Sequence, residues 1–442
     1  MTRHWLRALP CAVALLVTSA VVMRGADEKP ETPPATAALV IQGADLYTIT
    51  NGVIRGGTIV LEGGKITALG TGVSVPDGAE VIDARGKTVM PGLVAARLSG
   101  LLRGDTKKIA DALSPYSSTI TFALASGVTA GYVQAGGPGD QAFGGTNAVV
   151  KVIEGDLDGM LLREPADLNL RYANSDPRSK ALLRQQLRGA KEYLRKKAQF
   201  DQDKAAGKEA AEPAMPPGGE TLTKLLTGEL AARVSAQSSN DILSVVQLVD
   251  DFGIRLILEG PVEGWTVAEA IARRHADVIM TPRTMVERDR NVSAPTGSSN
   301  EQAAILARAG VRLAIVPPNT SFELWGGFGQ DLFTLPLEAA HAVGGGLPED
   351  RALAAITINP AEMMGVGDRI GSLQVGKDAD LIVMDGHPLD YRTFVELTIV
   401  NGKVLYDKSR SRLFSAVREK SELPQAEPVQ QPDTGGSPAV SP

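Results

Sequence analysis

Few side chains in this chain could attack a substrate or hold a metal ion. The 442 residues include four histidines and one cysteine, Cys11. Cys11 and His4 lie in an N-terminal stretch that we expect to be removed, so the mature protein would have no thiol nucleophile. His275 and His341 fall in predicted helices, and His387 falls in a predicted turn. We therefore expect no cluster of histidines.

Carboxylates offer acid–base chemistry instead. Glu259 closes an apolar run that predicts a strand, and Glu263 follows four residues later. A carboxylate at a strand end could serve as a general acid or base. Lys151 also ends a predicted strand, where we expect an exposed side chain. The glycine-rich segment 136–139 lacks the lysine of a phosphate-binding loop, so it predicts only a connecting loop.

The elements that must position these groups follow two patterns. Short apolar runs separated by turns occupy residues 38–90 and return at 369–406, which predicts β-strands at both ends of the chain. Between them, strands alternate with amphipathic helices, interrupted by a charged insertion at 178–219. This α/β alternation predicts a parallel sheet, and the number of units suits a (β/α)₈ barrel. The predicted strands are 128–133, 148–152, 233–236, 255–259, 277–280 and 312–316, and the predicted helices are 241–251 and 266–276.

The two termini differ from the rest of the chain. Arg3 and Arg7 precede an apolar run from Ala8 to Met23, which predicts an export signal over residues 1–26 and a periplasmic or secreted protein. The run is shorter than the roughly 20 residues of a membrane span, so we expect none after cleavage, although an uncleaved anchor is the alternative. Residues 27–37 form a Pro-rich linker. The tail, 420–442, is expected to be disordered.

The composition argues against two classes of binding partner. The formal net charge is −6, and no basic cluster stands out on a predicted face, which argues against nucleic acid. Aromatic residues make up only 4% of the chain, so a stacking surface for bases or sugars is not expected.

Several motifs resemble one known family, the imidazolonepropionase-like branch of the amidohydrolase superfamily. They are the segments LEGGKI (61–66), VIDARGK (81–87), VMPGLV (89–94), TINPA (357–361), GSLQVGKDADL (371–381) and VNGKV (400–404). The resemblance implies a barrel over residues 91–365 and a small β-sandwich built from 38–90 and 366–409. It also implies hydrolysis of C–N bonds with one or two divalent metals, usually zinc, that activate a water molecule.

The residues that would bind this metal are missing. The family's first ligands are a His-x-His pair shortly after Pro-Gly-Leu, where this chain has Arg97 and Ser99. A guanidinium has no acceptor lone pair and stays protonated, so Arg97 cannot bind a cation. Serine is a poor substitute for imidazole.

The later ligand positions are also replaced. The strand-5 histidine aligns with Ser235 or Gln237, and the strand-6 histidine aligns with Gly260. The aspartate expected after strand 8 aligns with Pro318 or Asn319. We therefore predict no metal and no other cofactor.

Three functions fit these observations. The first is an inactive amidohydrolase-fold protein that binds a small molecule. The second is a metal-independent hydrolase that uses Glu259, Gln237 or Arg97. The third is a subunit that partners an active paralogue, and a homo-oligomer is also compatible with the sequence. The candidate binding residues are Arg97, Ser99, Ser235 and Asn319. Arg97 is expected to pair with Glu259 or to bind a carboxylate ligand, and the alternative is that it turns to solvent.

Overall fold

The structure is a computed structural model that describes residues 38–104, 108–134, 143–173, 176–289, 295–322, 331–411 and 413. The predicted signal, linker and disordered tail lie outside the described residues. Within the described part, no helix has both the length and the apolar character needed to cross a bilayer.

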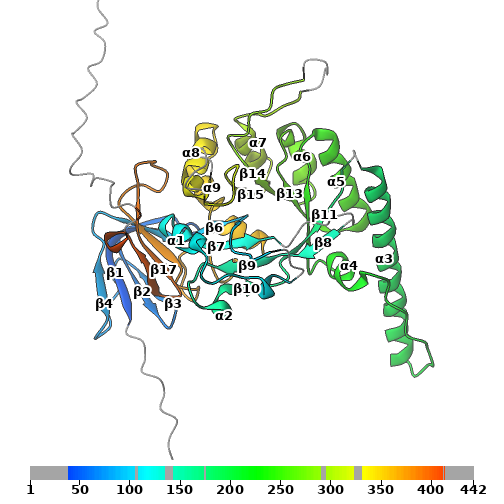
Figure 1. Ribbon diagram of the computed structural model, residues 1–442, viewed down its shortest axis with the longest axis horizontal. Coiled ribbons are helices and arrows are strands. Elements are labelled where there is room, and N and C mark those ends of the chain that lie inside the picture. Colours follow the sequence, from blue (N-terminus) through cyan, green and yellow to red (C-terminus); the bar gives the residue numbers. More distant parts are fainter. Residues whose placement is uncertain are drawn as a thin grey trace, which may run out of the picture. The chain divides into compact units, whose positions relative to one another are not determined.

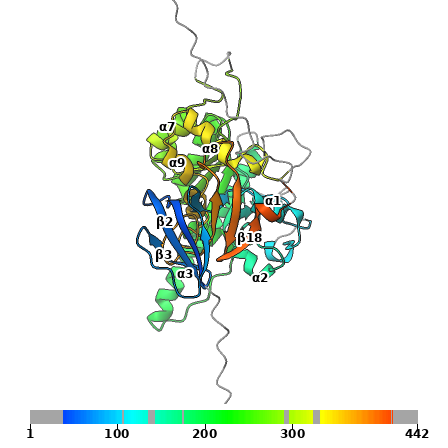
Figure 2. The same ribbon diagram turned by 90° about the vertical axis from the view of Figure 1, so that its left-hand side faces the viewer.

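Strands from both ends of the chain share one eight-stranded sheet (Figures 1 and 2). Its order is β18-β17-β16-β5-β1-β2-β3, and β4 pairs with β1. Gly63 and Gly64 both have positive φ, of 57° and 78°, which gives the β2–β3 hairpin that this dipeptide predicts. The strands are β1 Leu39–Tyr47, β2 Val53–Glu62, β3 Lys65–Gly70, β4 Glu80–Asp83, β5 Thr88–Pro91, β16 Leu381–Met384, β17 Val395–Val400 and β18 Lys403–Asp407.

The pairing of β5 with β16 joins the two ends of the chain. Pro91, Met90 and Val89 lie opposite Leu381, Ile382 and Val383 in antiparallel register. Alternate apolar side chains of this sheet form a separate buried core. A strand buries every second residue on one face, and this period was visible in the sequence.

The middle of the chain forms two further sheets, and they do not close into one barrel. The four-stranded sheet has the order β10-β9-β7-β6, and the six-stranded sheet has the order β15-β14-β13-β12-β11-β8. The described strands therefore give a mixed α/β fold, and the predicted (β/α)₈ barrel is not confirmed. These strands are β6 Leu93–Ala95, β7 Val128–Val133, β8 Phe143–Thr146, β9 Ala148–Lys151, β10 Leu161–Arg163, β11 Asp167–Leu170, β12 Ala231–Ser235, β13 Arg255–Glu259, β14 Asp277–Met280 and β15 Leu313–Ile315.

The segment 143–151 explains why the sheet is not a simple parallel one. It contains β8, Asn147 and β9, and it runs antiparallel to its neighbours β11 and β7. The predicted strand at 148–152 is confirmed as β9, but its expected parallel orientation is wrong, and β11 was not predicted at all. Between β15 and β6, the other ends of these two sheets, lies the loop after α9: the amide of Ile315 donates to Ala355 O and that of Val94 donates to Ile356 O, each at 3.0 Å.

Side chains from both sheets meet in a common interior. Ala96, Ala231, Ile257, Ile279 and Ala314 belong to one buried cluster although they come from β12 to β15 and from the residue after β6.

Helices cover the outside of these strands (Figure 1). The predicted helix 241–251 is confirmed as α5, which Ser238 caps by accepting a hydrogen bond from the Asp241 amide. The predicted helix 266–276 is shorter: a 3₁₀ turn at Gly264–Val267 leads into α6, which ends before His275. The helices are α1 Ser118–Ala125, α2 Leu157–Met160, α3 Pro177–Ala205, α4 Gly219–Leu226, α5 Ser239–Phe252, α6 Ala268–Ala272, α7 Gln302–Arg308, α8 Leu335–Gly344, α9 Glu349–Ala354 and α10 Ile358–Met363.

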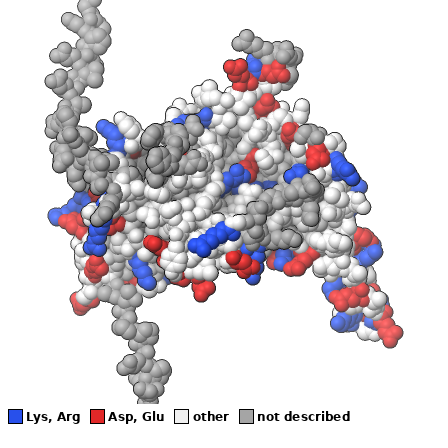
Figure 3. Space-filling model, in the orientation of Figure 1, with Lys and Arg blue, Asp and Glu red and all other residues white. Residues whose placement is uncertain are grey.

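The charged insertion contains one long helix, α3. Asp176 caps its first turn, Pro177 begins it, and Leu183, Leu187 and Ala190 are its buried residues. Beyond Ala190 no residue of α3 is buried, and Figure 3 shows side chains of both charge signs at the extending end of this helix. The second half of α3 is therefore held by local interactions rather than by a core.

Candidate functional site

An ion pair between Arg97 and Glu259 lies where the ends of two strands meet. Arg97 follows β6 by two residues, and Glu259 is the last residue of β13. Arg97 Nη2 lies 2.6 Å from Glu259 Oε2, and the two side chains are 36% and 14% exposed. The prediction that Arg97 faces inward and pairs with Glu259 is confirmed, and the alternative in which Arg97 turns to solvent is wrong.

A second arginine, Arg233, sits beneath this pair and is buried. Its Nη1 lies 3.6 Å from Glu259 Oε1, and its Nε donates to Asp167 Oδ2 at 2.9 Å. Its guanidinium stacks on the ring of Tyr132, with Cζ 3.6 Å from the ring centroid. The Tyr132 hydroxyl and the Asn147 amide both donate to Asp167 Oδ1, the latter at 2.6 Å. The two positive charges of Arg97 and Arg233 thus match the two negative charges of Glu259 and Asp167.

Burial and charge act together on this network. Burial alone would lower the pKa of Arg233, but the carboxylates of Asp167 and Glu259 and the Tyr132 side chain raise it further above its ordinary value. Burial raises the pKa of Tyr132 well above its ordinary value, and the neighbouring Arg233 offsets only part of that effect. Arg233 therefore stays charged and Tyr132 stays neutral, so the network is a permanent array of hydrogen bonds.

Arg97 also lines a cavity of about 280 Å³, which we call the mouth cavity. The other side chains that can form hydrogen bonds in its wall are Ser99, Gln134 and Thr320. Arg97 Nε is buried and has no hydrogen-bond partner in the described part of the chain. An unsatisfied buried donor costs about 1–3 kcal/mol, so a ligand atom that accepts from it would be favoured.

Ser99 belongs to the wall of this cavity, whereas Asn319 does not. The Ser99 amide donates to Thr320 O at 2.8 Å, and the two hydroxyl groups lie 3.0 Å apart. Asn319 Oδ1 instead accepts from the amide and the hydroxyl of Ser321, at 3.1 and 2.8 Å. Asn319 thus shapes a local turn, and its neighbour Thr320 occupies the position predicted for it.

The remaining predicted residues are not brought into the network. Ser235 lies opposite Glu259 in the sheet register, but both Ser235 and Gln237 are exposed. Among the described residues, no polar contact connects either side chain with Arg97 or Glu259. Glu263 accepts from the amides of Ser239 and Gly297, at 2.8 and 3.1 Å, so it holds two loops together rather than acting with Glu259.

The residues at these strand ends do not suit a metal ion. Within the described part, no three His, Cys, Asp or Glu residues come together as a metal site would need. The one carboxylate at the expected position, Glu259, is already between two guanidinium groups that would repel a cation. Gly260 has a φ of +63°, a conformation that strains a histidine side chain at that position. The histidines His275, His341 and His387 are all exposed, in agreement with their predicted placement outside the site.

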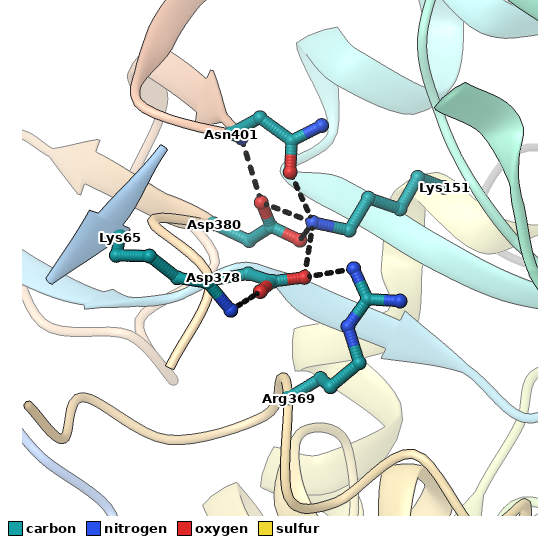
Figure 4. A network of polar contacts seen from close by, with 6 residues as sticks. All are labelled: Lys65, Lys151, Arg369, Asp378, Asp380 and Asn401. Carbon is teal, nitrogen blue, oxygen red and sulfur yellow. Dashed lines mark hydrogen bonds and ion pairs between the residues drawn. The ribbon is translucent and has the colours of Figure 1, made fainter. Parts of the chain in front are cut away.

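Lys151 is buried, so the prediction of an exposed side chain was wrong. Its Nζ lies 2.7 Å from Asp378 Oδ2 and 2.8 Å from Asp380 Oδ2, and it also donates to Asn401 Oδ1 (Figure 4). The end of β9 therefore packs against the C-terminal strands of the eight-stranded sheet, which we call the composite sheet. There Asp378 and Asp380 compensate the charge of Lys151.

Lys151 and Arg97 lie at opposite ends of the strands. It pairs with Ala130 near the start of β7, and Asp380 O accepts from the Gly92 amide just before β6. Lys65 and Arg369 complete the cluster, with Lys65 Nζ 2.5 Å and Arg369 Nη2 2.7 Å from Asp378 (Figure 4). This cluster joins the two parts of the fold.

Sequence reasoning missed Arg233, Asp167 and Asn147, which hold the pair in place. A signal for two of them existed. The strand residues Asp167-Leu168-Asn169-Leu170 alternate polar and apolar, and Arg233 interrupts the small apolar run of β12. When every second side chain of a buried strand is polar, these side chains must form hydrogen bonds or ion pairs with one another in the interior. Each would otherwise be buried without a partner.

Comparison with known proteins agrees with this fold. The model of the amidohydrolase family matches residues 301–405. The amidohydrolase tasK of Hapsidospora irregularis is 38% identical over 71 residues, which are 16% of this chain and 7% of that protein. The imidazolonepropionase of Thermoplasma acidophilum is 35% identical over 65 residues, which are 13% of this chain and 16% of that protein. The chain thus matches only a small part of the length of these curated relatives.

The fold extends the likeness over most of the chain. The crystal structure of an amidohydrolase from Thermotoga maritima superposes with a TM-score of 0.69 at 25% identity, covering 84% of this chain and all of the other. Together with the sequence matches, this likeness supports the amidohydrolase superfamily as the family of the chain.

Proposed function

We propose that this protein is a metal-free, non-hydrolytic binding protein built on the amidohydrolase fold, and that its ligand is a small carboxylate held by Arg97. The observation that carries the proposal is the Arg97–Glu259 ion pair, with Nη2 and Oε2 2.6 Å apart. It stands where the family resemblance places the first metal ligand. A fixed guanidinium there supplies positive charge without a metal.

Hydrolysis without a metal is disfavoured by the same contacts. Each oxygen of Glu259 faces an arginine, at 2.6 and 3.6 Å. To accept a proton from water, Glu259 would first have to give up its strongest partner. Gln237 is exposed and cannot donate a proton as an acid. The metal-independent hydrolase, which uses Glu259, Gln237 or Arg97, therefore has less support than a binding protein.

The preference for a carboxylate follows from the walls of the mouth cavity. Among the described residues that line it, Arg97 is the one charged side chain and none is acidic. Its unpartnered Nε adds a donor, and guanidinium groups bind carboxylates through pairs of donors. Ser99 and Thr320 provide hydroxyl groups for a second polar contact. The volume of about 280 Å³ restricts the ligand to a small acid.

Calorimetric titration of the purified chain with matched acids and amides tests the proposal. We expect benzoate and propionate to bind at least about tenfold more tightly than benzamide and propionamide, because only the acids form charge-assisted hydrogen bonds. Arg97→Ala should abolish this preference, and Arg97→Lys should retain a weaker one. Arg55→Ala, which removes an exposed arginine of the composite sheet, is the matched control.

Two outcomes would reject this function. One is an acid preference that persists in Arg97→Ala. The other is metal-dependent hydrolysis of an amide by the unmodified chain. The export signal leads us to propose that binding takes place in the periplasm or outside the cell, and association with an active paralogue remains a prediction of the sequence.

A further inference from the structure

A second, larger cavity lies between the composite sheet and the helices α1 and α8. It has a volume of about 440 Å³, and we call it the junction pocket. Its floor comes from β5, β6 and β16, and a segment from Pro388 to Val395 forms one side. A volume of this size is within the range of small-molecule sites, about 300–1,000 Å³.

The walls of the junction pocket are mainly apolar, and aromatic rings are prominent in them. Met90, Leu93, Ile382 and Met384 form apolar parts of the floor, and the rings of Phe333 and Phe394 line the sides. Aromatic side chains favour flat aromatic partners in offset or edge-on contact. A planar apolar molecule fits this chemistry better than a polar one.

One hydroxyl group in the wall has no partner. Thr393 Oγ1 is buried and forms no hydrogen bond within the described part of the chain. The hydroxyl of Ser126, also in the wall, donates to Ala123 O at 2.8 Å and keeps its lone pairs for an incoming donor. Buried hydroxyl groups normally have a hydrogen-bond partner, so Thr393 Oγ1 marks a position where a ligand atom can supply the missing one.

The walls of the pocket disfavour an organic anion. Asp331 and Asp390 line it, with Asp390 ion-paired to Arg392 at 2.8 Å, and none of the described lining residues is basic, so a carboxylate would lose its hydration without gaining a charged partner. The mouth cavity differs, because its described lining residues include Arg97 and no acid. The two cavities also contact opposite ends of the strands, because Leu93 begins β6 whereas Arg97 follows its end.

We propose that the junction pocket is a binding site for a small, neutral aromatic molecule with one hydroxyl or carbonyl group, which Thr393 anchors. Apolar burial against the floor supplies most of the affinity. The hydroxyl of Thr393 selects for the polar group, and the mainly apolar wall selects against a carboxylate, which would lose its hydration there. This site does not depend on the ligand proposed for the mouth cavity.

Three probes of similar shape test the proposal with the purified full chain: 2-naphthol, naphthalene and 2-naphthoate, followed by their fluorescence. We expect 2-naphthol to bind about tenfold more tightly than naphthalene, and 2-naphthoate to bind most weakly. Thr393→Val should reduce the affinity for 2-naphthol to that for naphthalene. Thr393→Ser, which keeps a hydroxyl group, should restore much of the difference.

Two further variants locate the binding. Ala125→Leu adds a side chain to the wall and should weaken all three probes, while Arg97→Ala should change none of them. Without ligand, Thr393→Val should raise the midpoint of thermal unfolding, because it removes an unpaired buried hydroxyl group. The proposal fails if Thr393→Val leaves the 2-naphthol affinity unchanged, if 2-naphthoate binds as well as 2-naphthol, or if Arg97→Ala rather than Ala125→Leu removes binding.

Discussion

Arg97 and Glu259 are far apart in the sequence, and their contact concentrates charge at the place where relatives of this fold are expected to hold a metal. Glu259 is 14% exposed, so its charge needs a partner more than that of the half-open Arg97 does. Arg233 at 3.6 Å is a weaker second partner. Removal of Arg97 should therefore leave the charge of Glu259 only partly compensated.

Arg97→Ala is expected to destabilise the protein by about 1–2 kcal/mol, less than the full cost of breaking a buried pair, because Arg233 remains near Glu259. Glu259→Gln should cost a similar amount, and the double variant should cost less than the sum of the two. Urea unfolding of the four proteins measures this coupling. Strictly additive effects would show that the two side chains do not interact in solution.

Asp378 should make stability depend on acid pH. Burial raises the pKa of this carboxyl, but hydrogen bonds from Lys151 and Lys65 outweigh burial and hold the pKa at about 2. Because the folded pKa lies below the unfolded value of about 3.9, its ionised form stabilises the protein by about 2 kcal/mol above pH 4, and this contribution is lost as the pH falls towards 2. Burial raises the pKa of Asp380, which acts with the opposite sign.

Denaturant unfolding between pH 5 and pH 2 measures this effect. The unmodified chain should lose its advantage over Asp378→Asn as the pH falls through this window. The difference between the two proteins should be largest at neutral pH. A constant difference down to pH 2 would contradict the assignment of the effect to Asp378.

At the scale of elements, β6 and β7 approach each other closely at the edge of the four-stranded sheet. Gly92 precedes β6, and a Cβ at this position would lie 2.0 Å from Thr129 Oγ1 and 2.2 Å from Thr129 Cγ2. Thr129 is itself buried, at 1% exposed, and has no room to move away. The Pro-Gly-Leu motif is therefore required by packing as well as by its resemblance to a family.

Gly92→Ala should destabilise the protein by about 3 kcal/mol, because the added methyl group overlaps a fixed side chain. Gly189→Ala is the matched control: Gly189 is exposed on α3 and a Cβ there meets no atom within 4 Å. That variant should stabilise the helix by about 0.5–1 kcal/mol. Thermal unfolding of both variants would contradict this account if the two shifts had the same sign.

At the scale of the whole molecule, ion pairs as well as apolar contacts join the composite sheet to the strands of the middle of the chain. Lys151, Asp378 and Asp380 come from the two parts and are nearly inaccessible to solvent. The two parts also border two different cavities: Arg97 lines the mouth cavity, and the described wall of the junction pocket is mainly apolar.

The predicted loss of the metal ligands leads to a measurement on the intact protein. Elemental analysis after gentle purification should find well below one zinc per chain, because no described residues form a set of ligands. A true zinc site would retain its metal through such a purification. About one zinc or more per chain would contradict the proposed binding function as well as the predicted loss of the metal.

The sequence by itself determined the local features. Turn dipeptides such as Gly63-Gly64 and the alternation of apolar residues predicted the hairpins and strands at both ends, because these preferences depend on neighbouring residues. The motifs around Pro91 and Asp378 indicated the family. The prediction that Arg97 and Ser99 stand in place of the metal ligands also came from the sequence alone.

Only the tertiary structure decided which distant residues meet. The antiparallel segment 143–151 interrupts the expected parallel order, and no local pattern distinguishes a parallel from an antiparallel neighbour. Lys151 was misplaced for the same reason: its partners lie more than 200 residues away in the sequence. Whether a charged side chain is exposed or paired depends on the strand that packs against it, and that choice is made by the fold as a whole.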